Sequence, residues 1–136
     1  MDKLITILIA DDSRVFRETL QFLCSTIDTI RIIGEATNGE EAIAFAAANS
    51  PDIILMDINM SPVNGFEATR RILQVNPTIK IIGVSMHTEP SYCKKMLRLG
   101  AKGYVAKEAA HAEIIEAIHE VNAGGSYIDK ETSGRM

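Results

Sequence analysis

The sequence has no tryptophan, and aromatic residues make up only 5% of its 136 residues. It also lacks a hydrophobic run long enough to cross a membrane, because the N-terminal apolar run, residues 4–10, stops at Asp11-Asp12. That run shows no small-residue cleavage pattern of an export signal. We therefore expect a cytoplasmic protein that makes no contact with a membrane.

Cysteine and histidine are scarce as well. Cys24 and Cys93 belong to no paired metal-ligand or redox spacing, so we expect idle thiols in a reducing compartment. His111 and His119 do not share one helix face, and His87 lies far from both, so no compact metal-ligand set is present. Solvated histidines are the favoured interpretation.

An excess of positive charge is absent too. Eighteen acidic and fourteen basic residues give a formal charge of −4, which would repel a nucleic-acid backbone and disfavours unassisted DNA binding. In contrast, hydrophobic residues make up 46% of the chain, enough to favour a packed core over disorder. The length fits one domain, since domains commonly have roughly 100–150 residues.

Predicted strands and helices alternate along the chain. Short apolar or β-branched runs predict strands at residues 4–10, 30–36, 53–56, 79–84 and 103–106. Amphipathic or capped segments predict helices after Ser13, from Asn38 to Asn49, and at about residues 65–74, 91–99 and 113–123. Such alternation implies an open parallel sheet with helices on both faces, because a closed barrel needs about eight units and around 250 residues.

In open sheets of this class, ligands bind where the strands end at their carboxyl side. The residues that leave the predicted strands there are Asp11, Asp12, Asp57, Ser85 and Lys107. Clustered carboxylates suit Mg²⁺, which prefers hard oxygen ligands and keeps further positions for water or phosphate. One Mg²⁺ and the lysine would neutralise three carboxylates before a dianionic phosphoryl group arrives.

This set of residues supports a specific chemistry. Asp57 could attack phosphorus in line and form an acyl phosphate, while the metal and Lys107 stabilise the equatorial oxygens. The Ser85 hydroxyl could then donate to a phosphoryl oxygen and report the modification. Taken singly, Asp12 could cap a helix and Asp57 could end a strand in a turn. Their combination with Lys107 favours the site.

Four segments form a specific pattern: Ile9-Ala10-Asp11-Asp12, Leu55 to Met60 followed by Asn64-Gly65, Val84-Ser85, and Gly100 to Lys107. With this pattern nearly the whole sequence resembles the receiver domains of bacterial two-component response regulators. The resemblance implies a flavodoxin-like α/β fold of three layers, with five strands in the order 2-1-3-4-5. It also implies a phosphorylation switch whose output face is the fourth helix, fifth strand and fifth helix.

The resemblance further implies roles for individual residues. A sensor histidine kinase would phosphorylate Asp57, Lys107 would contact the phosphoryl group, and Ser85 and Tyr104 would form the switch pair. The implied Mg²⁺ ligands are Asp12, Asp57 and the carbonyl group of Asn59, with help from Asp11. Such a domain is no enzyme beyond its own phosphoryl transfer and autodephosphorylation.

Residues 103–107 and 123–128 look like the NarL/FixJ class of regulators, which usually continue into a LuxR-type helix-turn-helix domain. We therefore expect a receiver domain at residues 1–124, and in residues 125–136 the start of a linker to an absent DNA-binding domain. That domain would supply DNA binding and transcriptional control, and phosphorylation could drive homodimerisation. A stand-alone single-domain regulator is the alternative.

Two positions depart from the pattern of the family. Ser61 stands where a proline is usual, and Pro62 follows it, so the path of the loop beside the metal is open. Glu108 stands where many receivers have a proline after a cis peptide, and we expect a trans bond because a non-proline cis bond costs roughly 2.5–4 kcal/mol. We also hypothesise that His87, two residues beyond Ser85, controls the access of water to the acyl phosphate.

Other functions fit the residues less well. A Mg²⁺-dependent phosphohydrolase of the haloacid-dehalogenase type would want an aspartate two residues after its nucleophile, where this sequence has Asn59. A flavin-binding module would need a hydroxyl-rich phosphate loop, but Asp11-Asp12 would repel the phosphate. An interaction module with a vestigial site is disfavoured because all five polar residues are present.

Overall fold

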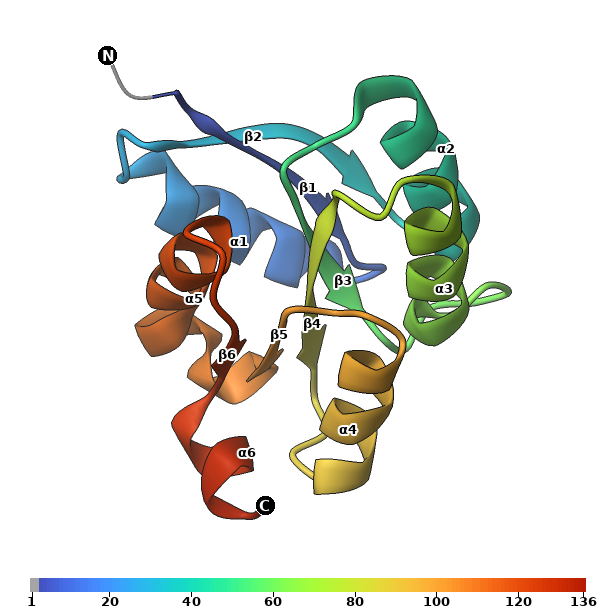
Figure 1. Ribbon diagram of the computed structural model, residues 1–136. Coiled ribbons are helices and arrows are strands. Elements are labelled where there is room, and N and C mark those ends of the chain that lie inside the picture. Colours follow the sequence, from blue (N-terminus) through green and yellow to red (C-terminus); the bar gives the residue numbers. More distant parts are fainter. Residues whose placement is uncertain (1–2) are drawn as a thin grey trace.

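The strands form one parallel sheet in the order β2-β1-β3-β4-β5-β6 (Figure 1). The computed structural model describes residues 3–136, so the first two residues of the expected domain lie outside the described part. The strands are β1 (Ile5–Ala10), β2 (Ile30–Ala36), β3 (Ile53–Asp57), β4 (Lys80–Ser85), β5 (Gly103–Ala106) and β6 (Tyr127–Ile128). The order of the first five strands confirms the predicted topology.

Helices cover both faces of the sheet, which gives the predicted three layers (Figure 1). One layer contains α1 (Arg14–Ser25) and α5 (Lys107–Asn122). The other layer contains α2 (Gly39–Asn49), α3 (Gly65–Val75) and α4 (Pro90–Arg98). A short helix, α6 (Lys130–Gly134), follows β6 and lies beside α4. Within residues 3–136 no helix is both long and apolar enough to span a membrane.

Alternate residues of the central strands enter two different hydrophobic cores. On β1, Ile7 and Ile9 pack with α1 and α5, whereas Leu8 and Ala10 pack with the helices of the other layer. All four side chains are fully buried. Burial on both faces explains why the strands are almost unbroken apolar runs rather than alternating ones. Because the strands are parallel, their carboxyl ends all lie at the same edge of the sheet.

The two predicted capping residues, Ser13 and Asn38, lie at the N-termini of α1 and α2. The Ser13 side chain accepts a hydrogen bond from the backbone N–H of Phe16 at 3.2 Å, and Asn38 accepts one from Glu41 at 2.8 Å. The prediction for α5 was wrong, because this helix begins at Lys107 and not at Glu113. Its first turn has no capping side chain at Ala106, so the sequence carries no start signal there.

The C-terminal segment, where the sequence predicts the start of a linker, contributes a short strand to the sheet. Tyr127 and Ile128 extend the sheet by parallel pairing with Gly103 and Tyr104 of β5, and Asp129 is completely buried. A strand of two residues has no detectable periodicity, so the sequence could not predict it. The sheet therefore has a sixth strand beyond the expected five.

Both positions that depart from the family pattern are defined in the structure. The Ser61-Pro62 peptide bond is cis, and it is the only cis bond in the described part of the chain. The Lys107-Glu108 bond is therefore trans, as predicted.

Candidate functional site

The predicted site residues meet at the carboxyl edge of the sheet. Asp11 follows β1, Asp57 ends β3, Ser85 ends β4 and Lys107 begins α5. The register of the sheet brings these ends together, since Asp57 pairs with Val84 in the neighbouring strand. The predicted convergence of these residues is therefore found in the fold.

Three carboxylates form a compact cluster. Asp11, Asp12 and Asp57 each offer an oxygen atom, and these atoms lie within 4.8 Å of one another. Asp11 and Asp57 are each 2% exposed, whereas Asp12 is open to solvent. Three carboxylates at this spacing, one of them reachable from solvent, fit a small hard cation such as Mg²⁺.

Asp57 lies in an environment that disfavours its charge. Burial, followed by the negative charge of Asp11, raises the pKa of Asp57 to about 7. The Lys107 ammonium group and a 3.3 Å hydrogen bond from the backbone N–H of Asn59 act in the opposite direction but do not prevail. A divalent cation bound to the cluster would reverse this balance and keep Asp57 ionised and nucleophilic.

Lys107 reaches into the same cluster. Its Nζ atom lies 2.8 Å from Oδ2 of Asp11 and 3.7 Å from Oδ1 of Asp57. The ammonium group also lies 4.7 Å from the ring centroid of Phe16, a cation–π contact that the sequence did not indicate. The lysine is thus held at the mouth of the site by one carboxylate and one aromatic face, close to Asp57.

Arg17, which the sequence analysis did not predict as a site residue, binds the backbone of Asp11. Nη1 of Arg17 donates to the backbone carbonyl of Asp11 at 2.8 Å, and its Nε pairs with Glu35 of β2 at 2.9 Å. The position of Arg17 one turn into α1 is its only sequence signal. The arginine thus ties α1 to the loop that carries the cluster.

The contacts of Gly65 explain why Asn64-Gly65 follows the loop after β3. The N–H of Gly65 donates to the carbonyl of Ile58 at 2.9 Å, and Asn64 caps α3 by accepting from Glu67 at 2.9 Å. A Cβ atom at residue 65 would lie 2.7 Å from Cα of Ile58 and even closer to the carbonyl oxygen of Asp57. Only glycine lets α3 begin this close to the end of β3.

Ser85 and Tyr104, the predicted switch pair, both contact the backbone of His87. The Ser85 hydroxyl accepts a hydrogen bond from the N–H of His87 at 3.1 Å, and the Tyr104 hydroxyl donates to the His87 carbonyl. Both side chains are completely buried, and burial raises the pKa of Tyr104 to about 12. One residue of the β4–α4 loop therefore connects the two.

His87 is not the solvated histidine that the sequence suggested. Its ring stacks on Tyr92 with centroids 4.1 Å apart and planes inclined by 5°, and its Nε2 lies 3.1 Å from the side-chain amide of Asn59. The imidazole ring of His87 is thus beside the loop that follows Asp57. His119 pairs with the Thr29 hydroxyl at 2.9 Å, whereas His111 is exposed.

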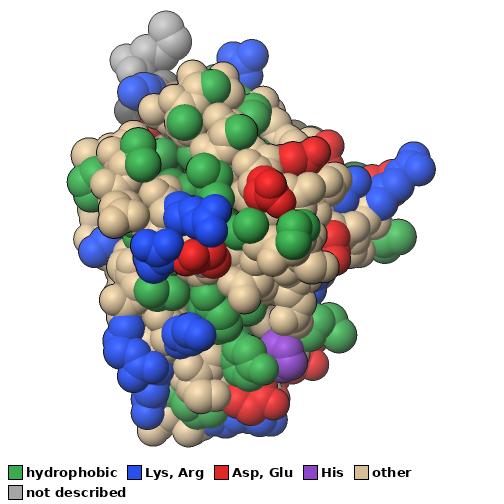
Figure 2. All heavy atoms as spheres, turned by 90° about the vertical axis from the view of Figure 1, so that its right-hand side faces the viewer, with side chains coloured by type: hydrophobic (Ala, Val, Ile, Leu, Met, Phe, Trp, Pro, Cys, Tyr) green, Lys and Arg blue, Asp and Glu red, His purple; other side chains and the backbone are tan. Residues whose placement is uncertain are grey.

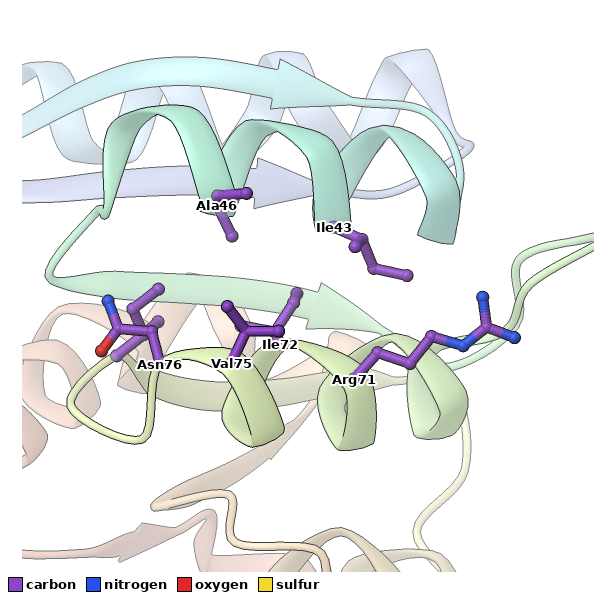
Figure 3. Close-up of a pocket in the computed structure, with 8 residues that line it drawn as sticks. Ile43, Ala46, Arg71, Ile72, Val75 and Asn76 are labelled. Atoms are coloured by element: carbon purple, nitrogen blue, oxygen red, sulfur yellow. The ribbon is translucent and has the colours of Figure 1, made fainter.

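An apolar pocket elsewhere in the molecule has no part in this site. It lies between α2 and α3, where Ile43 and Ala46 face Ile72 and Val75 (Figure 3). Its lining contains no acidic residue and none of the site residues. The carboxyl edge of the sheet is therefore the candidate functional site.

Comparison with known families identifies this arrangement. The family model described as the response regulator receiver domain matches residues 7–119. The chain belongs to this receiver family. Receiver domains generally use Mg²⁺, which agrees with the acidic cluster at Asp11, Asp12 and Asp57.

Known relatives place the receiver domain in two-component signalling. It is 36% identical to the response regulator UvrY of Escherichia coli over 98% of this chain and 61% of that protein. It is 40% identical to the transcriptional regulatory protein DegU of Brevibacillus brevis over 97% of this chain and 56% of that protein. The chain thus spans about three fifths of the length of these relatives.

A solved structure agrees with the fold over nearly the whole chain. A two-component response regulator of the LuxR family from Aurantimonas sp. SI85-9A1 superposes with a TM-score of 0.94 and 28% sequence identity. The match covers 98% of this chain and 95% of that chain, so it includes most of the C-terminal segment.

Proposed function

We propose that this receiver domain accepts a phosphoryl group from a sensor histidine kinase on Asp57, in the presence of Mg²⁺. The observation that carries the proposal is the convergence of Asp11, Asp12, Asp57 and Lys107 on one edge of the sheet. A nucleophilic carboxylate, a cation site and a positive side chain are the parts that phosphoryl transfer to a carboxylate needs.

In the proposed reaction, a carboxylate oxygen of Asp57 attacks phosphorus while the bond from phosphorus to the histidine nitrogen of the kinase breaks. The nitrogen keeps the bonding electron pair, and Asp57 becomes an acyl phosphate. Lys107 compensates the charge on the phosphoryl oxygens. Asp11, Asp12, Asp57 and the Asn59 carbonyl would hold Mg²⁺, which supplies further charge compensation when bound. Attack of water on the acyl phosphate later releases phosphate and restores Asp57.

The switch would pass through the β4–α4 loop. A phosphoryl oxygen offers a strong acceptor to the Ser85 hydroxyl, which in the unmodified protein accepts from His87. If Ser85 moves toward the phosphoryl group, its hydrogen bond from the backbone N–H of His87 changes. The carbonyl group of the same residue accepts a hydrogen bond from Tyr104, so Tyr104 would be affected as well. Phosphorylation would thereby bias a two-state equilibrium toward an active conformation. In that conformation the face formed by α4, β5 and α5 would differ from the inactive one.

We further propose that the receiver domain controls transcription through a C-terminal DNA-binding domain. The relatives that it matches are longer, and one of them is a transcriptional regulatory protein. The face in Figure 2, seen from the side of α2, α3 and α4, mixes basic, acidic and hydrophobic side chains. A mixed surface and a net charge of −4 do not favour direct binding to DNA. A stand-alone regulator that acts through protein contacts, or through a phosphorylation-induced homodimer, is the alternative.

Acetyl phosphate with Mg²⁺ tests the proposed phosphorylation without the kinase. Intact-mass measurement should show one added phosphate on the wild-type protein, absent from Asp57→Ala and retained in Asp28→Ala, an exposed aspartate at the opposite edge of the sheet. Loss of the added mass when Mg²⁺ is chelated would support the cation site. A wild-type protein that gains no phosphate under these conditions would refute the function.

A further inference from the structure

The start of α5 depends on a residue outside both β5 and α5. Ala106, which precedes the helix, has no side chain that can cap it. Its backbone N–H instead donates to Oδ1 of Asp129 at 3.0 Å. Since the next residue is Lys107, the carboxylate of Asp129 fixes the turn that aims the lysine at Asp11 and Asp57.

The other oxygen of Asp129 holds the C-terminal helix. Oδ2 accepts from the N–H of Thr132 at 3.1 Å and so caps α6. The backbone N–H of Asp129 donates to the carbonyl of Tyr104 at 3.0 Å. Asp129 is completely buried, so both of its oxygens are committed to these partners rather than to water.

We propose that Asp129 is a positioning residue for Lys107 and that it couples the docking of residues 126–134 to phosphorylation of Asp57. This inference rests on the proposed function. The carboxylate of Asp129 joins the turn before Lys107 to the first turn of α6. A shift of either turn therefore moves the carboxylate and changes its hydrogen bond to the other turn. Because coupling free energy is reciprocal, docking of the segment favours phosphorylation and phosphorylation favours docking.

Two features oppose the docking of α6 in the unmodified protein. The Thr132 hydroxyl is the one buried side-chain polar atom without a hydrogen-bond partner among residues 3–136, which opposes docking. Glu131 of α6 also lies beside Glu108 of α5, and this neighbouring carboxylate raises the pKa of Glu108. Because these features oppose docking, we expect the contact to respond measurably when phosphorylation stabilises it.

A second attachment of the same segment provides a matched control. Glu113 of α5 accepts from the Tyr127 hydroxyl at 2.6 Å and from the N–H of Lys130 at 3.1 Å. Glu113 therefore holds β6 and α6 without touching the turn before Lys107. Glu113→Gln should loosen the segment, whereas Asp129→Asn should loosen it and also release that turn.

The experiment compares wild type, Asp129→Asn and Glu113→Gln with acetyl phosphate and Mg²⁺. We expect the maximal phosphorylation rate of Asp129→Asn to fall on the order of tenfold, because small misplacements of catalytic groups have large effects on rate. Glu113→Gln should lose much less. Hydrogen exchange of the wild-type protein should show roughly fivefold or greater added protection at Ala106 and Thr132 after phosphorylation. In Asp129→Asn this added protection should be lost.

Several outcomes would overturn the inference. A wild-type phosphorylation rate in Asp129→Asn, or an equal loss in Glu113→Gln, removes the positioning role. Unchanged exchange at Ala106 and Thr132 in the phosphorylated wild-type protein removes the coupling, and this measurement needs no variant that could misfold. If the wild-type protein gains no phosphate at all, the proposed function has failed instead.

Discussion

Lys107 lies closer to Asp11 than to Asp57, with its Nζ atom 2.8 Å from the first carboxylate and 3.7 Å from the second. The ammonium group therefore compensates Asp11 more fully, and the negative charge of Asp57 is left poorly balanced in a buried position. Phosphorylation would offer Lys107 a stronger anionic partner on Asp57 itself. Burial and the charge of Asp11 therefore prevail over Lys107 and raise the pKa of Asp57, which sets how the metal-free protein should respond to pH.

The first prediction concerns stability without metal. Because the pKa of Asp57 is raised to about 7, the folded protein holds a proton that the unfolded chain releases near pH 4. The free energy of unfolding should therefore fall as pH rises from about 4 to 7. A pKa that differs between the folded and unfolded states makes the free energy of unfolding depend on pH. Asp57→Asn should abolish the decrease in the free energy of unfolding and stabilise the metal-free protein at pH 8 by roughly a few kcal/mol. Urea unfolding in EDTA at pH 4.5 and pH 8 measures it.

The control for that measurement is Asp28→Asn, which changes an exposed aspartate in the same way. We expect it to leave the pH dependence as in wild type. A stability difference between Asp57→Asn and wild type that is equal at both pH values would contradict the prediction.

The second prediction concerns Mg²⁺ affinity. Asp12 is the exposed member of the acidic cluster, so Asp12→Ala removes a ligand without opening a cavity in the core. Titration of Mg²⁺ followed by thermal unfolding should show a smaller stabilisation than in wild type at the same concentration, since stabilisation by a bound ligand grows with its affinity. In EDTA the two proteins should unfold at nearly the same temperature. Equal Mg²⁺ stabilisation of both would argue against Asp12 as a ligand.

The third prediction concerns Gly65. In Gly65→Ala, the new Cβ would meet the Asp57 carbonyl and Cα of Ile58, both backbone atoms that cannot rotate away. We expect a loss of about 1–3 kcal/mol in the free energy of unfolding and slower phosphorylation, because either α3 or the end of β3 must shift. Gly134→Ala is the control for the free energy of unfolding, since a Cβ there would meet nothing within 4 Å. Wild-type stability and rate in Gly65→Ala would contradict the close packing.

The fourth prediction concerns the lifetime of the acyl phosphate. His87 packs on Tyr92 and lies 3.1 Å from the Asn59 side chain, beside the loop that follows Asp57. Removing this ring in His87→Ala should admit water and shorten the lifetime of phosphorylated protein, followed by intact mass after removal of acetyl phosphate. His111→Ala, on an exposed position of α5, is the control. An unchanged lifetime in His87→Ala would remove the hypothesis.

The sequence predicted those parts of the fold that depend on long apolar runs and on helix caps. The almost complete burial of β1 and the complete burial of β3 leave a clear signal, and the side chains of Ser13 and Asn38 mark two helix starts. The start of α5 was missed because its stabilising carboxylate, Asp129, lies more than twenty residues away in the chain. Contacts of this kind depend on tertiary structure and leave no local pattern.

The site residues likewise divide into those that the sequence predicted and those that depend on tertiary contacts. Asp11, Asp57 and Lys107 were predictable because parallel strands bring their carboxyl ends to one edge. The contacts of Phe16 with Lys107 and of Arg17 with Asp11 were not, since aromatic and basic residues on an amphipathic helix have several ordinary positions. The stacking of His87 on Tyr92 likewise depends on how the β4–α4 loop folds back.

The sixth strand has a practical consequence for chimaeric regulators. Cutting the chain at residue 124 would strip β6 from the edge of β5 and leave the amide of Ala106 without its carboxylate. A bare sheet edge invites pairing with other molecules, so such a truncated module should aggregate more readily. Grafts of this domain onto a foreign effector should therefore join beyond Gly134, where α6 ends.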